Sequence, residues 1–313
     1  MISILDVAAK AGVSKSSVSR YFNGGSISEA TRAKIQDAVA ALNYKPNAIG
    51  NMLRNNSTNS IALCVPTMVH PFFSSFVSEV NRVVMSHGYR LIIGESQDKY
   101  ESEETIVQMV ENNEVDGLIL VTHSTRSGPL NTSLPIVTVD RHFEGAPCIT
   151  STNYESVMDG LDYLKKKGCK RIGFLGGRPS VESEVNARYC AYLDFCEEEG
   201  VEPLACYEEI SHGQEYSVAK PFLDSHPEID GIFAASDAFA LASFPCVEGR
   251  HIPILAFDGC LEGWIHSPRF TSIRQNIPLL ARKAVELLLR RVKGETISTI
   301  ERIPTEFIPG ETA

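Results

Sequence analysis

Five polar residues near the N-terminus have the side chains that proteins use to contact nucleic acids: Lys15, Ser16, Ser19, Arg20 and Asn23. Hydroxyls, amides and cations form hydrogen bonds to base edges and to phosphates. These residues share one face of a helix predicted from Lys15 to about Phe22, whose N-terminus can also receive a phosphate. A solvated polar face on a small helical cap would have the same composition, so this spacing alone leaves both interpretations open.

A second group of residues stands where predicted strands of the remaining chain end. Asp140 and Arg141 end one strand, Asp258 ends another, and Phe73 follows the first. Pockets form at the carboxyl ends of parallel strands. Carboxylates and guanidinium groups bond to adjacent hydroxyls, and an aromatic ring covers the apolar face of a sugar. The pattern predicts a polyol site, although each residue could instead be a structural cap or part of a salt bridge.

Short helices are predicted to position the first group. Ser3, Ser14 and Ser28 are candidate N-caps of three helices, the last from 29 to 42 with an apolar stripe. Gly12 separates the first two helices, at a turn where glycine adopts a positive φ at little cost. The polar run 55–60 then predicts a linker.

The chain from Ile61 alternates between apolar strands and helices, which indicates parallel sheet buried on both faces. The predicted fold class is α/β: an all-α helix-turn-helix head followed by two doubly wound α/β subdomains. Strands are predicted at 61–65, 91–94, 117–121, 136–140, 172–175, 231–234 and 254–257. Helices are predicted at 73–87, 105–112, 156–167, 187–199 and 279–293.

Composition and charge narrow the class of protein. The 313 residues include 43% hydrophobic and 22% charged residues, which excludes a disordered or fibrous chain. We expect a cytoplasmic protein because no signal peptide, membrane span or paired-cysteine pattern is evident. Residues 1–57 hold seven Lys and Arg against three acids, and the rest hold 22 against 36. A basic head on an acidic body is expected when only the head contacts DNA.

Longer motifs in the chain closely resemble those of LacI/GalR-type bacterial transcription regulators. In the N-terminal region they are 6–14 (DVAAKAGVS), 18–20 (VSR), 28–32 (SEATR) and 42–48 (LNYKPNA). In the rest they are 70–73 (HPFF), 115–119 (VDGLI), 139–141 (VDR), 234–237 (AASD), 256–259 (AFDG), 271–275 (TSIRQ) and 284–289 (AVELLL). The resemblance covers nearly the whole chain.

The resemblance implies a homodimer with two heads in successive major grooves of a pseudo-palindromic operator. Lys15 and Ser16 are then expected to read bases. Phosphate contact and orientation would fall mainly to Ser14, Ser17, Ser19, Arg20 and Asn23. A hinge helix at 48–54, flanked by Asn47 and ending at Arg54, would carry Leu53 as an apolar wedge for the minor groove. Gly50 departs from the family's usual Ala and should make this hinge order less readily.

The resemblance also implies a body like that of periplasmic sugar-binding proteins, with an effector between two subdomains. Arg188, within 186–189 (NARY), matches the family's ligand-binding arginine. The expected limits are 1–46 for the helix-turn-helix domain, 47–57 for the hinge and 58–313 for the body. Its N-subdomain would hold about 58–148 and 277–293, and its C-subdomain about 149–276 and 294–313.

Two departures from the family pattern concern the body. Thr152-Asn153 stands where Asp-Asn is common, so one carboxylate is missing from the expected pocket. The segment 237–258 is about two helical turns short and contains Pro245, which would break a helix. Both features count against dimerisation through that segment.

Taken together, these residues predict a sequence-specific transcriptional regulator that represses a carbohydrate-use operon under control of a sugar or sugar phosphate. No enzyme activity, cofactor or metal site is expected, because catalytic and metal-ligand motifs are missing from the sequence. Two alternatives stay open. One is a regulator controlled mainly by a docked phosphocarrier protein, and the other is a sugar- or nucleotide-processing enzyme with a helical accessory head.

Overall fold

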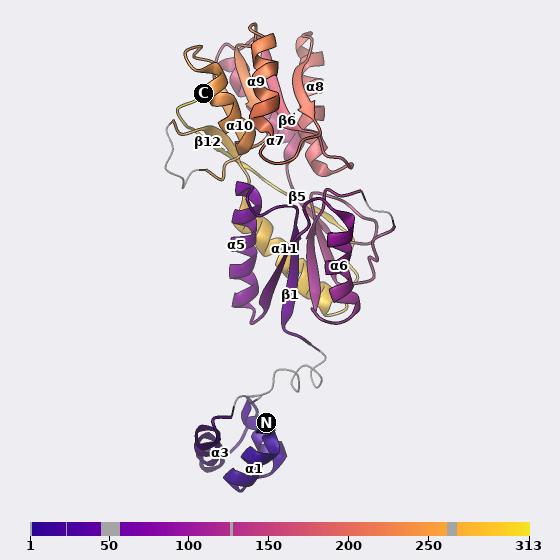
Figure 1. Ribbon diagram of the computed structural model, residues 1–313, viewed down its shortest axis with the longest axis vertical. Coiled ribbons are helices and arrows are strands. Elements are labelled where there is room, and N and C mark those ends of the chain that lie inside the picture. The colour runs from indigo at the N-terminus through magenta and orange to yellow at the C-terminus, as the bar shows by residue number, and fades with distance from the viewer. Residues whose placement is uncertain (1, 23, 45–56, 126–127, 262–267) are drawn as a thin grey trace. The chain divides into compact units, whose positions relative to one another are not determined.

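A computed structural model describes residues 2–22, 24–44, 57–125, 128–261 and 268–313. Contacts within the chain divide it into two compact units, Met1–Thr58 and Asn59–Ala313, which we call the head and the body. Figure 1 shows both units along the chain. Among the described residues, no helix combines the length and the apolar character needed to cross a membrane.

The described residues of the head form three helices, α1 (Ile4–Ala11), α2 (Lys15–Phe22) and α3 (Glu29–Leu42). Ser3 and Asp6 form a capping box at the start of α1, and Gly12 ends it with φ 63°, in the left-handed region that favours glycine. Apolar residues from all three helices form one small core: Val7, Ala8, Ala11, Val18, Ile35 and Ala38. The three predicted helices are therefore confirmed.

The body contains two six-stranded sheets. The first has the order β11-β5-β4-β3-β1-β2 and is parallel throughout. Its strands are β1 (Ser60–Val65), β2 (Arg90–Glu95), β3 (Gly117–Val121), β4 (Ile136–Val139), β5 (Cys148–Ser151) and β11 (Ile300–Ile303). The second has the order β12-β10-β9-β8-β6-β7, in which β12 pairs antiparallel with β10. Its strands are β6 (Ile172–Gly177), β7 (Leu204–Glu208), β8 (Gly231–Ala234), β9 (Ile254–Asp258), β10 (Thr271–Arg274) and β12 (Glu306–Ile308).

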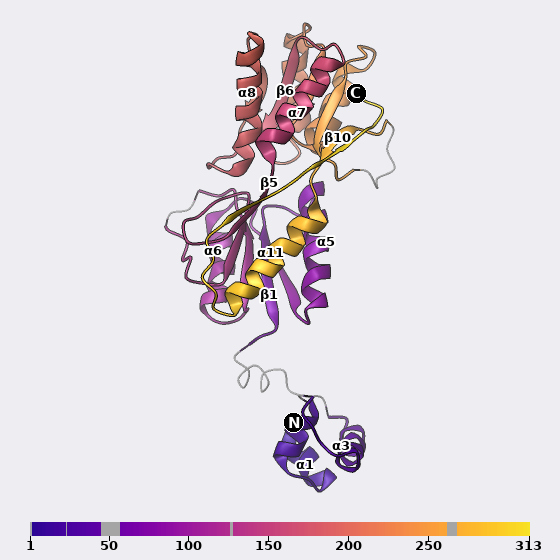
Figure 2. The same ribbon diagram turned by 180° about the vertical axis from the view of Figure 1, so that it is seen from behind.

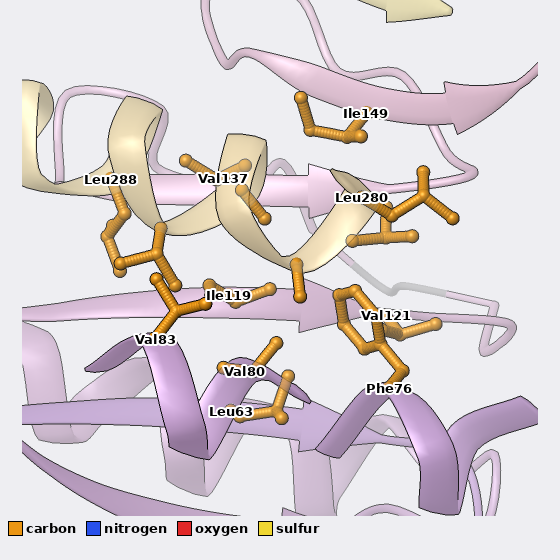
Figure 3. Packing of buried hydrophobic residues seen from close by; sticks show 14 of the residues in the cluster. Leu63, Phe76, Val80, Val83, Ile119, Val121, Val137, Ile149, Leu280 and Leu288 are labelled. Atoms are coloured by element: carbon orange, nitrogen blue, oxygen red, sulfur yellow. The ribbon is translucent and has the colours of Figure 1, made fainter. Parts of the chain in front are cut away.

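Helices cover both faces of the first sheet, α5 (Pro71–Ser86) and α11 (Ile277–Val292) on one face and α6 (Tyr100–Glu111) on the other. Alternate residues of β1 point to opposite faces. Leu63 packs toward α5 and α11, whereas Ala62 and Cys64 pack toward α6. Figure 2 shows α11 lying across this sheet, and Figure 3 shows Phe76 and Val80 of α5 against Leu63 and Val121.

The second sheet is covered in the same way, by α7 (Asn153–Lys166) and α8 (Ala187–Glu199) on one face and by α9 (Glu215–Ser225) and α10 (Asp237–Ser243) on the other. Phe174 and Phe233 face α7 and α8, and Leu175 and Ile232 face α9 and α10. Two sheets with helices on both faces confirm the predicted α/β fold class.

The C-terminal segment does not lie wholly in the subdomain to which it was assigned. Residues from 294 onward were assigned by the resemblance to the second subdomain, but β11 pairs in parallel with β5 in the first sheet. Ile303 is buried in the core of the first subdomain, which explains why the chain pairs there before it crosses. The crossing to the second sheet lies between β11 and β12, and the other two crossings follow β5 and β10.

All seven predicted strands are present, but five strands and two helices were not predicted. The strands β5, β7, β10, β11 and β12 are three to five residues long and rich in polar residues, so their hydrophobic pattern is weak. The helix α9 contains Pro221, and α10 has only seven residues. The short strands form because they pair with strands that are distant in sequence, which a local pattern does not record.

We predict that Phe76→Ala lowers the free energy of unfolding of the body by about 3–5 kcal/mol, because it leaves a cavity in a fully buried core. Urea denaturation followed by circular dichroism would measure the change. Met85→Ala on the same helix is the control, since the Met85 side chain is 63% exposed. An equal loss in both variants would contradict this account of the core.

Candidate functional site

The helix α2 is anchored on one side and polar on the other. Val18 is fully buried in the head core, while Lys15, Ser16 and Arg20 are exposed. The Arg20 side chain also lies against Gly25, whose backbone N–H donates to the Arg20 carbonyl at 2.8 Å. The structure therefore places three of the predicted DNA-contact residues together in solvent, on a helix whose orientation is set by its buried side.

Serine hydroxyls gather at the N-terminus of α2. Ser14 accepts a hydrogen bond from the Ser17 backbone N–H at 3.1 Å, and its hydroxyl lies 2.7 Å from that of Ser16. Ser17 and Ser19 are half-buried beside the exposed face. The predicted contact residues Asn23, Asn47, Leu53 and Arg54 lie outside the described residues, as does Gly50. Their roles remain predictions.

The body contains a cavity of about 210 Å³ between its two sheets. The residues that line it stand at the carboxyl ends of parallel strands, as expected for doubly wound sheets. In the first subdomain they include Thr67 after β1, Asp98 after β2, His123 after β3 and Asp140 after β4. In the second they include Arg178 after β6, His212 after β7, Ser236 after β8, Asp258 in β9 and Gln275 after β10. Phe73, Asp140, Arg188 and Asp258, four of the predicted effector residues, line this one cavity.

Arg188 lies in the first turn of α8 and is almost completely buried. Its Nη1 lies 3.5 Å from Asp258 Oδ1 and donates to the Ala235 carbonyl at 2.8 Å. Its guanidinium carbon also lies 3.8 Å from the centroid of the Phe257 ring. Burial lowers the pKa of Arg188, and the Asp258 carboxylate opposes that effect. A buried guanidinium held by these contacts is preorganised for binding, because few rotamers are left to lose.

A chain of hydrogen bonds joins Arg188 to the first subdomain. Arg188 Nε donates to Asn153 Oδ1 at 2.8 Å, and Asn153 Nδ2 donates to Thr150 Oγ1 at 3.1 Å. Thr150 Oγ1 in turn donates to Asp140 Oδ1 at 2.7 Å. Asn153, which follows the departure from Asp at position 152, therefore links the cavity arginine to Asp140 through the β5 crossing.

The second crossing is joined to the same group. Gln275 Nε2 donates to Asp258 Oδ1 at 2.8 Å, and Gln275 Oε1 accepts from Ser151 Oγ at 2.6 Å. Gln275 follows β10, and Ser151 ends β5. A buried polar network thus connects the cavity with the segments where the chain crosses between subdomains after β5 and β10.

Asp140 and Asp258 both have positive φ, 60° and 93°, at the ends of their strands. Such a backbone conformation is uncommon outside glycine, and it clusters at functional sites. Burial raises the pKa of Asp140, although the Thr150 hydroxyl and Arg188 act in the opposite direction. The two carboxyls turn into the cavity because their strands end in these sharp bends.

Arg141 is the one predicted effector residue that is not among the residues lining the cavity, and its role in effector binding stays a prediction. Its Nη1 donates to the Ser124 carbonyl at 2.7 Å, and its guanidinium lies over the Phe143 ring at 4.8 Å. The bend at Asp140 directs that residue inward, and the next residue then packs against the loop that follows β3.

Three histidines that the sequence did not single out line the cavity: His70, His123 and His212. His70 is the N-cap of α5, and its Nδ1 accepts from the Phe72 N–H at 3.3 Å. Each of the three follows the carboxyl end of a predicted or observed strand. A position after a strand end is therefore the sequence signal that could have identified these histidines. For His212 that signal was missing, because the strand before it, β7, was not predicted.

The segment 237–258 contains α10 and a 3-10 turn, Phe244–Val247. Pro245 stands at the start of this turn, where it needs no N–H partner, and the α-helix ends at Ser243. Leu241 on α10 is 43% exposed.

Among the described residues, no cluster of three or more histidines, cysteines or acids is arranged to hold a metal ion.

We predict that Arg188→Met lowers the free energy of unfolding of the body by about 3–5 kcal/mol, because Asp258 is left as a buried unpaired charge. Adding Asp258→Asn should restore part of the loss, since it removes that charge. Urea denaturation of both variants would measure this. The exposed pair Lys165–Glu199 supplies the control, because Lys165→Met should change little. A double variant less stable than Arg188→Met would contradict the pairing.

Two family models match the chain. The one described as bacterial regulatory proteins of the lacI family matches residues 3–47, and the one described as a periplasmic binding protein-like domain matches residues 161–313. The matched segments contain α2 of the head and, in the body, Arg188, Asp258 and Gln275 of the polar network.

Known relatives match the chain over its full length. The ribose operon repressor of Halalkalibacterium halodurans is 29% identical over 322 residues, covering 100% of this chain and 97% of that protein. The sucrose operon repressor of Streptococcus mutans is also 29% identical, over 318 residues and 99% and 98% of the two chains. These relatives are regulators and not enzymes.

Solved structures show the same architecture. A periplasmic binding protein/LacI transcriptional regulator of Alkaliphilus metalliredigens, complexed with D-xylulofuranose, is 25% identical with a TM-score of 0.71, covering 81% of this chain and 98% of that one. The Lac repressor dimer bound to operator is 22% identical with a TM-score of 0.85, covering 99% and 98%, which establishes the shared fold. The chain therefore combines a lacI-family domain at residues 3–47 with a periplasmic binding protein-like domain, and it is similar over its full length to bacterial operon repressors.

Proposed function

We propose that this protein is a transcriptional repressor of a carbohydrate-use operon, acting in the cytoplasm as a homodimer on a pseudo-palindromic operator. The observation that carries this proposal is α2, which is anchored by the buried Val18 and presents Lys15, Ser16 and Arg20 to solvent. The relatives named as ribose and sucrose operon repressors support the carbohydrate assignment.

Lys15 and Ser16 stand in the first turn of α2, the part of a recognition helix that reaches base edges. We assign base reading to them. Arg20 is in the last turn and is assigned to a phosphate. The serine hydroxyls around Ser14 would orient the helix against the backbone, and Asn23 would add a further contact.

We propose the domain limits 1–46 for the helix-turn-helix domain, 47–57 for the hinge and 58–313 for the body. The hinge would carry Asn47, Leu53 and Arg54 to the operator. The effector would bind in the cavity to Phe73, Asp140, Arg188 and Asp258.

Effector binding would control operator affinity by linkage. The buried network of Arg188, Asn153, Asp258 and Gln275 reaches the β5 and β10 crossings, so a ligand bonded to Arg188 or Asp258 acts directly on the segments that set the angle between subdomains. A coupling of about 1–3 kcal/mol would change operator affinity roughly 5–150-fold.

Operator selection tests this function. Purified protein mixed with fragmented genomic DNA should enrich two-fold symmetric sites over random sequence. Sugars should then change the affinity for the selected site in a gel-shift titration. The proposal fails if no symmetric fragment is preferred over random DNA, with sugars present or absent.

We predict that Arg20→Ala weakens binding to specific and random DNA alike, and reduces the slope of log K against log salt by about 1, because one phosphate contact is lost. Fluorescence anisotropy at several salt concentrations would measure the slope. Lys34→Ala on α3 is the control, since it removes the same charge from another exposed position of the head. An unchanged slope for Arg20→Ala would reject the phosphate assignment.

A further inference from the structure

Four rings form a row along one wall of the cavity, which we call the imidazole row: His123, Phe73, His70 and His212. The ring centroids of His123 and Phe73 are 5.9 Å apart, those of Phe73 and His70 5.3 Å, and those of His70 and His212 5.4 Å. Three of these residues belong to the first subdomain, whereas His212 follows β7 of the second. The row therefore runs across the boundary between the subdomains and would be set by their relative position.

The partners of the three imidazoles determine which nitrogen carries the proton. His70 Nδ1 accepts from the Phe72 N–H, so neutral His70 has its proton on Nε2 and offers a donor. His212 Nδ1 lies 3.2 Å from Glu215 Oε1, and His123 Nδ1 lies 3.7 Å from Asp98 Oδ1. A proton on each of those Nδ1 atoms faces a carboxylate, which leaves Nε2 of both residues as an acceptor. The row thus offers one donor and two acceptors.

The charges around the cavity disfavour an anionic ligand. Four carboxyl groups line it, those of Asp98, Asp140, Glu215 and Asp258, against the two guanidinium groups of Arg178 and Arg188. Arg188 is already paired with Asp258. A phosphate at the row would lie beside Asp98 and Glu215 and would meet the lone pairs of two imidazoles. Like charges brought together in a partly buried site repel strongly.

We propose that the imidazole row is a hydroxyl-binding subsite, and that the effector of this protein is an uncharged polyhydroxyl compound whose phosphate ester is excluded. This inference rests on the proposed function and names the chemical class of its effector. Hydroxyls suit the row because each can donate to one imidazole Nε2 and accept from another. Phe73 in the middle of the row would cover an apolar face of the same ligand.

Acid should weaken this subsite. Burial lowers the pKa of His70; His212 and Arg188 lower it further, whereas Asp258 and Glu215 raise it. The protonated His70 would lose the acceptor for the Phe72 N–H. Because the pKa of His70 is lowered from the ordinary value of about 6.5, the affinity for a neutral ligand should fall as the pH drops below that value. The difference in affinity between a neutral ligand and its phosphate ester should become smaller at the same time.

The test compares matched pairs of ligands on the full-length protein. D-ribose, D-xylulose and sucrose, each beside its monophosphate ester and within a panel of neutral mono- and disaccharides, would be screened by thermal shift and titrated by calorimetry at pH 7.5. We expect a neutral sugar to raise the melting temperature, and to bind at least about tenfold more tightly than its ester. An ester that binds as tightly as its parent sugar overturns the proposal, and so does a panel in which no neutral member binds.

Variants separate the row from the rest of the cavity. His212→Phe keeps the ring beside His70 but removes both nitrogens, and should weaken the neutral ligand about tenfold. His226→Phe is the matched control, because His226 also pairs with an acid, Glu228 at 3.0 Å, but lies outside the cavity lining. Equal affinities of His212→Phe and wild type would overturn the proposal.

A second variant addresses the pH dependence. His70→Asn supplies a side-chain oxygen to cap α5 but does not titrate, so it should flatten the loss of affinity between pH 7.5 and 5.5. A pH profile identical to that of wild type would count against His70. The preference for a two-fold symmetric operator over random DNA is measured in parallel, without ligand. If this preference persists while the sugar tests fail, only the effector class is wrong. If the preference is absent, the proposed function itself fails.

Discussion

The buried pair of Arg188 and Asp258 is the interaction on which the organisation of the body depends. Both side chains are almost inaccessible to solvent, and the charge of each is tolerable only because the other lies 3.5 Å away. Asn153 and Gln275 complete their hydrogen bonding and connect the pair to the crossings after β5 and β10. The pair is therefore joined by hydrogen bonds to the segments that connect the two subdomains.

The two walls of the cavity differ in chemistry. The side around Arg188 is a network of charges and amides, whereas the imidazole row of His123, Phe73, His70 and His212 is a series of aromatic rings. A neutral, hydroxyl-rich ligand satisfies both, because hydroxyls donate to carboxylates and imidazoles and accept from guanidinium groups.

The head follows a simpler principle. Its helices are too short to persist alone in water, and one small core around Val18 holds them together. Because Val18 is buried in this core, Lys15, Ser16 and Arg20 on the other side of α2 are directed into solvent. The positive charge of this region and the negative charge of the rest keep the two tasks, contact with DNA and sensing, in separate parts of the chain.

The sequence by itself determined the local features: the three head helices, the seven apolar strands and the strand-end positions of Phe73, Asp140 and Asp258. Caps, periodicity and turns are encoded within a few residues, so they can be recognised without the fold. Only the tertiary structure decided that β11 joins the first sheet, that Arg141 donates to the Ser124 carbonyl and that His212 meets His70. These outcomes depend on contacts between residues far apart in sequence, such as Ile300 with Cys148, and no local pattern records which distant segment will be the partner.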